Sequence, residues 1–365
     1  MREGKFGTHE AIWLLTITIS AKVFFSGPSL VATIVGTAGW YMSLISACVA
    51  FLALMLIFAL LNLYPGKTLM EIYDTIFGTF GGSLFSLTLF TVLFVSVVVP
   101  LREFIDVLKV YVLPASPPSY LLAIFISVIS TMAFLGLETL ARFAKLVAYV
   151  LLSGYVIVIL LSSQLYEIYR LFPVLGYGLG KTVLQGVLRS SSYGEIVIIG
   201  IIIASVHNIK YAKRAAGISL VLSAIITSTA LLAFSLAFPY YTGQEITAPI
   251  YLMASLIEYG KVIQRIEPVF FFVWIISTVI SVAVLFYASL IVYLHVFRLD
   301  DKRPLIIPFG IIMLELAMVP ISTTQLINNQ VQLLREYGGI FFFLPPAIAL
   351  AVAKLRGLKG GTSNA

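Results

Sequence analysis

The sequence predicts an all-helical integral membrane protein with about ten transmembrane helices. Hydrophobic residues make up 60% of the 365 residues and charged residues only 11%, whereas soluble domains are roughly 25% charged. The apolar runs are about 18 to 27 residues long, which suits helices that cross a hydrocarbon core about 30 Å thick. They lack the short alternating pattern of outer-membrane barrel strands, so we expect helical spans.

The expected spans follow the apolar runs in chain order. They cover residues 10–35, 38–62, 79–100, 119–135, 139–162, 182–208, 214–238, 267–297, 304–321 and 338–355. The first run follows Arg2 and Lys5, as in a signal peptide, but it is long and has no small-residue cleavage site, so we expect it to be retained. The outer connections "REFIDVLK" (102–109) and "PIYLMASLIEYG" (249–260) are expected to form surface helices.

The basic residues predict the orientation of these spans. With a cytoplasmic N-terminus, the inner segments carry 14 basic residues, namely Arg2, Lys5, Lys67, Arg142, Lys145, Lys210, Lys213, Arg214, Arg298, Lys302, Arg303, Lys354, Arg356 and Lys359. The outer segments carry 8, namely Arg102, Lys109, Arg170, Lys181, Arg189, Lys261, Arg265 and Arg335. The positive-inside rule therefore places both termini in the cytoplasm.

The chain is expected to be a single transmembrane domain over residues 1–365, with a flexible tail at 359–365. The sequence contains no phosphate-binding glycine loop, metal-ligand cluster or nucleophile elbow, so we expect no enzyme activity, no cofactor and no metal. Its net charge of +7 is spread over short polar segments without interleaved aromatic residues. This pattern favours a membrane protein over a nucleic-acid-binding protein.

The first expected span contains two features that a spanning helix normally avoids. In "ISAKVFFSGPS", residues 19–29, Lys22 brings a charge to membrane depth, and Gly27 with Pro28 weakens the helix and removes a backbone donor. Polar residues and helix breaks at this depth are costly and therefore mark candidate functional sites. The candidate ligand-binding residues here are Ser20, Ala21, Lys22, Val23, Phe24 and Gly27.

The sixth expected span contains a similar interruption in "RSSSYGEIVI", residues 189–198. Three serines and Gly194 weaken the helix, and Glu195 adds a charge. The candidate ligand-binding residues here are Ser191, Ser192, Tyr193, Gly194 and Glu195. As an alternative, the serines and glycines serve only close helix packing.

The two interruptions fall in the first members of two groups of five spans. Such matched breaks are typical of inverted-repeat transporters, in which half-helix ends expose backbone groups to a ligand. We therefore expect repeat one over residues 8–165 and repeat two over residues 178–358. We also expect Lys22 and Glu195 to face one cavity, because each buried charge is costly without a partner.

Five stretches resemble, in order, the B subunits of GerA-type spore germinant receptors, a family within the amino acid/polyamine/organocation transporter superfamily. They are "YPGKTLMEIYDTIFGTFGG", "LREFIDVLKVYVLPASPP", "GLETLARFAKL", "LFPVLGYG" and "IQRIEPVFFFVW". The resemblance implies a ten-helix LeuT-like core that binds a small germinant, usually an amino acid, in the spore inner membrane. It also implies an A-type subunit and a lipoprotein C-type subunit as partners.

The chain departs from related transporters at the first interruption. Where those carry small, glycine-rich sequence, this chain has Ala21, Lys22 and Val23. Lys22 is therefore either a ligand group or a tethered cation in the place of a coupling ion, and the alternative is a lysine that snorkels to the inner interface. Two functions stay open: a ligand-sensing receptor subunit, or an amino-acid or amine permease coupled to protons or ions.

Overall fold

A computed structural model describes residues 4–206, 208–259, 263–264 and 266–357. The first half contains α1 (Thr8–Ser20), η1 (Ala21–Phe24), α2 (Gly27–Val35), η2 (Gly36–Ala38), α3 (Gly39–Leu63), α4 (Leu69–Tyr111), α5 (Pro118–Leu135), α6 (Leu137–Leu161), η3 (Ser162–Leu165) and η4 (Ile168–Leu171). The η elements are 3-10 helices, except for the π-helix η7 in the second half. The expected tail at 359–365 lies outside the described residues.

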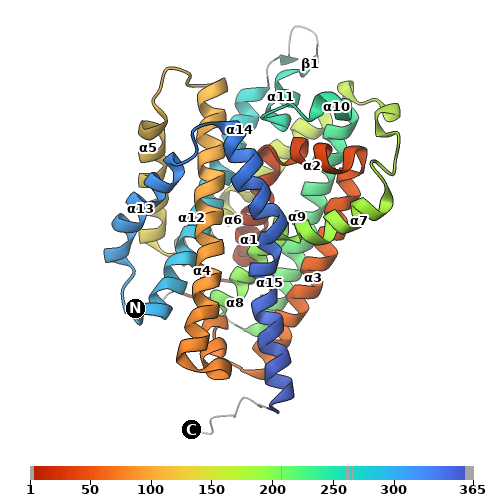
Figure 1. Ribbon diagram of the computed structural model, residues 1–365. Helices are drawn as coiled ribbons and strands as arrows, with labels where there is room; N and C mark the ends of the chain where they lie inside the picture. Colours follow the sequence, from red (N-terminus) through yellow and green to blue (C-terminus); the bar gives the residue numbers. More distant parts are fainter. Residues whose placement is uncertain (1–3, 207, 260–262, 265, 358–365) are drawn as a thin grey trace.

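The second half contains α7 (Leu179–Leu188), η5 (Arg189–Val197), α8 (Ile198–Ile201), η6 (Ile203–Ser205), α9 (Ile209–Ala237), α10 (Tyr240–Gly243), α11 (Pro249–Ser255), β1 (Glu258–Tyr259), β2 (Ile263–Gln264), α12 (Glu267–Phe297), α13 (Arg303–Met318), α14 (Thr323–Gln325), η7 (Leu326–Val331) and α15 (Gln332–Leu355). The two short strands pair antiparallel. The long helices form one bundle, and α15 ends at its lower end in Figure 1.

Seven helical stretches in the described part of the chain are long and apolar enough to cross a membrane. They are Gly27–Leu63, Leu69–Tyr111, Pro118–Leu135, Leu137–Leu165, Ile209–Ala237, Glu267–Phe297 and Thr323–Leu355. The other three expected spans are missing from this set for a geometric reason. The spans at 10–35 and 182–208 are divided into short elements, and α13, in the span at 304–321, has only 16 residues.

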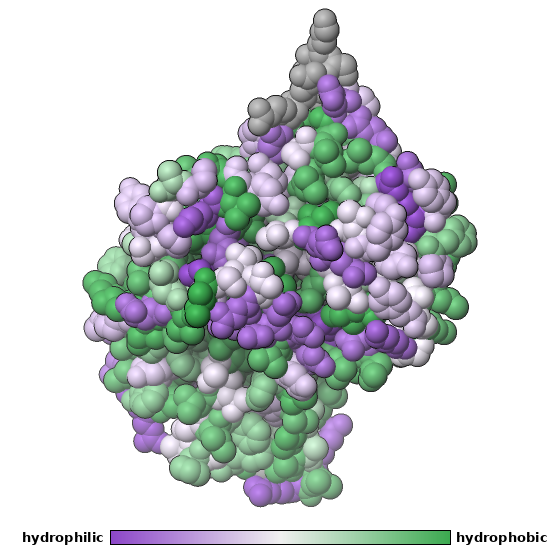
Figure 2. All heavy atoms as spheres, turned by 45° about the horizontal axis from the view of Figure 1, so that its top comes forward, coloured by the Kyte–Doolittle hydropathy of each residue, from purple (hydrophilic) through white to green (hydrophobic). Residues whose placement is uncertain are grey.

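The surface of the bundle is that of an integral membrane protein. Many large apolar side chains point outward from the helices, among them Phe80, Leu146 and Ile307, which are more than 70% exposed. Soluble monomers rarely expose so many large apolar side chains together. Figure 2 shows apolar residues over the lower body and polar residues gathered on the upper face.

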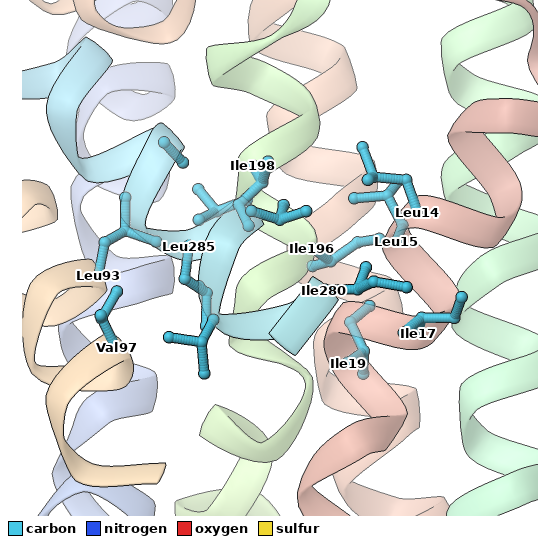
Figure 3. Packing of buried hydrophobic residues seen from close by; sticks show 14 of the residues in the cluster. Leu14, Leu15, Ile17, Ile19, Leu93, Val97, Ile196, Ile198, Ile280 and Leu285 are labelled. Atoms are coloured by element: carbon cyan, nitrogen blue, oxygen red, sulfur yellow. The ribbon is translucent and has the colours of Figure 1, made fainter. Parts of the chain in front are cut away.

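The centre of the bundle is α12, which packs against α1, α4, α5 and α6. Figure 3 shows side chains of four regions in one apolar cluster: Leu14, Leu15, Ile17 and Ile19 of α1, Leu93 and Val97 of α4, Ile196 and Ile198 around the start of α8, and Ile280 and Leu285 of α12. This cluster holds the two interrupted regions of the chain against each other. The interruptions therefore lie within a packed core and not in a loop.

Two segments differ from the sequence-based expectation. The stretch "REFIDVLK" is not a surface helix, because α4 continues to Tyr111 and buries Arg102, Glu103 and Asp106. Arg102 and Asp106, one helical turn apart, form an ion pair at 2.9 Å. The last helix begins well before residue 338, so Arg335 lies in α15 and not in an outer loop.

Candidate functional site

The first interruption separates α1 from α2. The α-helix ends at Ser20, a 3-10 turn covers Ala21–Phe24, and Phe25 has an extended backbone (φ −90°, ψ −158°). A new α-helix then begins at Gly27, with Pro28 in its first turn. Proline is tolerated there because the first turn has no intrahelical use for its missing N–H. The interruption predicted from Lys22, Gly27 and Pro28 is thus present.

A carboxylate from α4 binds the amino end of α2. Glu103, which is buried, accepts a hydrogen bond from the backbone N–H of Ser26 at 2.8 Å and another from the Ser26 hydroxyl. The amino end of a helix carries unsatisfied N–H groups and a partial positive charge, so a carboxylate is stabilised there. The chain therefore supplies its own anion at this half-helix end.

The second interruption is η5, a nine-residue stretch of 3-10 helix from Arg189 to Val197. Runs of more than three or four residues of 3-10 helix are uncommon, and inside a longer helix they mark a hinge or strain. Two side chains fasten η5 to its neighbours. The Ser191 hydroxyl donates to the carbonyl of Arg335 at 2.6 Å, and the Tyr193 hydroxyl bonds the Ser43 hydroxyl at 2.6 Å.

Lys22 and Glu195 join the two interruptions. The Lys22 ammonium forms an ion pair with the Glu195 carboxylate, and the side chains are only 10% and 2% exposed. The alternative of a lysine that snorkels to the inner interface is thus wrong. The two charges do pair as expected, but of the two only Lys22 lines the cavity described next.

A cavity, which we call the central cavity, lies beside this ion pair. Its volume is about 60 Å³. It is lined by Ile19, Lys22, Val23, Phe25, Gly27, Leu30, Val31, Met42, Ser43, Ser46, Glu103, Arg189, Ser192, Tyr193, Thr227, Leu231, Val331 and Arg335. Both interruptions therefore contribute to one cavity, and four of its lining side chains are charged.

Of the residues expected to bind a ligand, five line the central cavity: Lys22, Val23, Gly27, Ser192 and Tyr193. The other six lie nearby with different contacts. Ser20 donates to Thr16 of its own helix, and Phe24 packs on the rings of Tyr155 and Phe270. Ala21 is buried, and the Ser191 hydroxyl donates a hydrogen bond to α15. Glu195 does not line the cavity but pairs with Lys22, which does.

Gly194 fits the packing alternative. A Cβ atom at this position would collide with the ring of Phe342 on α15. On the facing side, a Cβ at Gly339 would lie 2.9 Å from the Ser190 hydroxyl. Small residues on both elements thus allow η5 and α15 to approach closely, as is common between membrane helices.

Three charged residues of the cavity were not expected from the sequence: Glu103, Arg189 and Arg335. Arg189 and Arg335 were assigned to outer segments, but Arg189 is buried in η5 and Arg335 lies in α15. A usable signal was present for Glu103, which directly precedes the mostly apolar stretch "FIDVLKVYVL" (104–113) at the end of α4. Within the described residues, no group of three or more His, Cys, Asp or Glu side chains is placed to hold a metal ion.

Together, the fold and the site define a helical membrane protein with two interrupted helices, a buried ion pair and a cavity lined in part by charged side chains. Residues 5–326 match the family model of spore germination proteins, and the chain belongs to this family. It is similar to the spore germination protein YndE of Bacillus subtilis (strain 168). The two are 24% identical over 279 residues, which cover 75% of each chain. The family expected from the five sequence stretches is thereby confirmed.

Proposed function

We propose that this chain is the B-type subunit of a spore germinant receptor and that it binds a small germinant in the central cavity. One observation carries the proposal: the two interrupted helices meet at a buried ion pair beside a cavity lined by charged side chains. Buried charges in a membrane helix are costly, and they commonly mark a ligand pathway or site. Membership of the spore germination protein family supports germination as the process served.

The proposed architecture has ten spans in a LeuT-like arrangement of two inverted repeats, residues 8–165 and 178–358. The 3-10 segments at Ala21–Phe24 and Arg189–Val197 support it, since they fall in the first span of each proposed repeat. The short helix α13 would serve as the ninth span. Both termini would face the cytoplasm of the spore core, with the protein in the spore inner membrane.

In the proposed mechanism, the ligand changes the balance between two arrangements of the bundle. A ligand can shift such an equilibrium only by binding one arrangement better than the other. Lys22 on η1 and Arg335 on α15 come from separate elements, so a ligand held by both would favour the arrangement in which they are close. A-type and lipoprotein C-type subunits would sense this arrangement at the surface of the bundle.

The test is to measure ligand binding and transport with the same purified protein. We expect a germinant to raise the melting temperature of the detergent-solubilised chain and to show no net accumulation in proteoliposomes. Saturable accumulation that requires Lys22 would instead establish the permease function. If no small amino acid or carboxylic acid raised the melting temperature, the binding role would be lost.

A further inference from the structure

The charged groups of the central cavity differ in whether they have hydrogen-bond or ion-pair partners within the chain. Two carboxylates, Glu103 and Glu195, and three cations, Lys22, Arg189 and Arg335, belong to the site. Each carboxylate already has a partner within the chain. Glu195 pairs with Lys22, and Glu103 accepts two hydrogen bonds from Ser26.

The two arginines of the site have weaker partners within the chain than the carboxylates have. Arg189 donates to the Gln185 amide oxygen at 3.3 Å and is attracted by the Glu336 carboxylate. The Arg335 guanidinium lines the cavity and makes no side-chain hydrogen bond or ion pair within the described part of the chain. Glu103 and Glu195 attract it, but neither contacts it. A guanidinium offers five donors and commonly holds a carboxylate with two of them.

A free amino acid presents two charged groups, a carboxylate and an ammonium. Arg335 is available for the carboxylate, but the ammonium would need an acceptor carboxylate, and both of those are engaged. A buried ammonium without such a partner is strongly disfavoured. The Lys22 ammonium already occupies the position that a ligand ammonium would take beside Glu195.

The size of the cavity limits the ligand further. One water needs about 10 to 15 Å³ of such space. The central cavity, at about 60 Å³, therefore has room for about four to six waters, which a ligand with a similar number of non-hydrogen atoms would replace. Short monocarboxylates such as lactate and glycolate are of this size.

We propose that the central cavity is specific for a small monocarboxylate without an ammonium group, with Arg335 as the residue that binds its carboxylate. Lys22 takes the place of the ligand ammonium and makes the site selective against amino acids. This inference rests on the proposed function and narrows its ligand from amino acids and related molecules to short carboxylic acids.

The test compares matched ligand pairs that differ only in an ammonium or a hydroxyl: L-alanine with L-lactate, and glycine with glycolate. We expect the purified chain to bind the hydroxy acid at least tenfold more tightly in calorimetry at neutral pH. Equal or tighter binding of the amino acid would overturn this inference and leave the proposed function standing. Binding of neither member of either pair would overturn both.

Variants of Arg335 test the assigned contact. Arg335→Gln should weaken lactate binding about tenfold to a hundredfold, the range expected for a hydrogen bond to a charged group. Arg335→Lys, which keeps the charge, should recover part of the loss and guards against a folding defect in the glutamine variant. The matched control is Arg142→Gln, which removes an exposed guanidinium paired with Glu138 on α6. Unchanged lactate binding in a folded Arg335→Gln protein would overturn the assignment.

Discussion

The Lys22 ammonium and the Glu195 carboxylate form a buried ion pair across 173 residues of sequence. Lys22 belongs to the interruption that follows α1, and Glu195 belongs to the 3-10 segment η5. The pair therefore connects the two interrupted regions, η1 and η5, both of which are 3-10 helices. A buried ion pair is by itself weak support for stability. The main effect of this pair is therefore to fix how the two interrupted regions contact each other.

Removal of one partner of the pair should be costly. Lys22→Met leaves the Glu195 carboxylate buried without its cation, which typically destabilises a protein by about 3 to 5 kcal/mol. The double change Lys22→Met with Glu195→Gln leaves no unpaired charge and should recover part of this loss. A double-mutant cycle in thermal stability measures the coupling. Strictly additive effects would contradict the pairing.

The contact between Ser26 and Glu103 should anchor the amino end of α2. Glu103→Gln replaces a charged acceptor of two hydrogen bonds, each typically about 1.5 to 3 kcal/mol for a charged group. Ser26→Ala removes only the hydroxyl bond, so its melting temperature should fall less than that of Glu103→Gln. Ser235→Ala is the control, since that hydroxyl bonds only its own helix. Equal effects of the three substitutions would argue against an anchoring role.

Close packing of η5 on α15 should make Gly194 intolerant of a side chain. Gly194→Ala would push a methyl group into the Phe342 ring, and overpacking of this kind typically costs about 1 to 3 kcal/mol. The control is Gly217→Ala on α9, where the added methyl group would meet no atom within 4 Å. That change should be neutral or slightly stabilising, because alanine favours a helix. A smaller side chain at position 342 should rescue Gly194→Ala, and failure of this rescue would contradict the packing account.

The sequence predicted the interruptions because their causes are local. Gly27, Pro28 and the serines at 190–192 weaken a helix wherever they occur, and an apolar run makes the weakness visible. The Lys22 and Glu195 pairing followed from the cost of leaving either charge alone. The first inference needed only neighbouring residues in the sequence, and the second needed only a general energetic rule.

The other half of the cavity depends on tertiary packing and was missed. Glu103, Arg189 and Arg335 each stand next to polar residues at the edge of an apolar run, where hydropathy ends a span. In the structure, α4 and α15 extend beyond those edges, and Glu103 and Arg335 on these helices line the central cavity. Span length was misjudged for the same reason, because a buried charge interrupts a hydropathy signal without interrupting the helix.

The most direct test of the site compares two lysines that carry the same kind of ion pair in different places. Lys22 pairs with Glu195 beside the central cavity, whereas Lys145 pairs with Glu10 at 2.7 Å, and neither of these two lines it. The measurement is calorimetric affinity for L-lactate and L-alanine in wild type, Lys22→Met and Lys145→Met, each first shown to be folded. For whichever of the two ligands the wild type binds, we predict at least a tenfold loss of affinity in Lys22→Met and wild-type affinity in Lys145→Met. Wild-type affinity in Lys22→Met, or an equal loss in both variants, would contradict a binding site between the two interrupted helices.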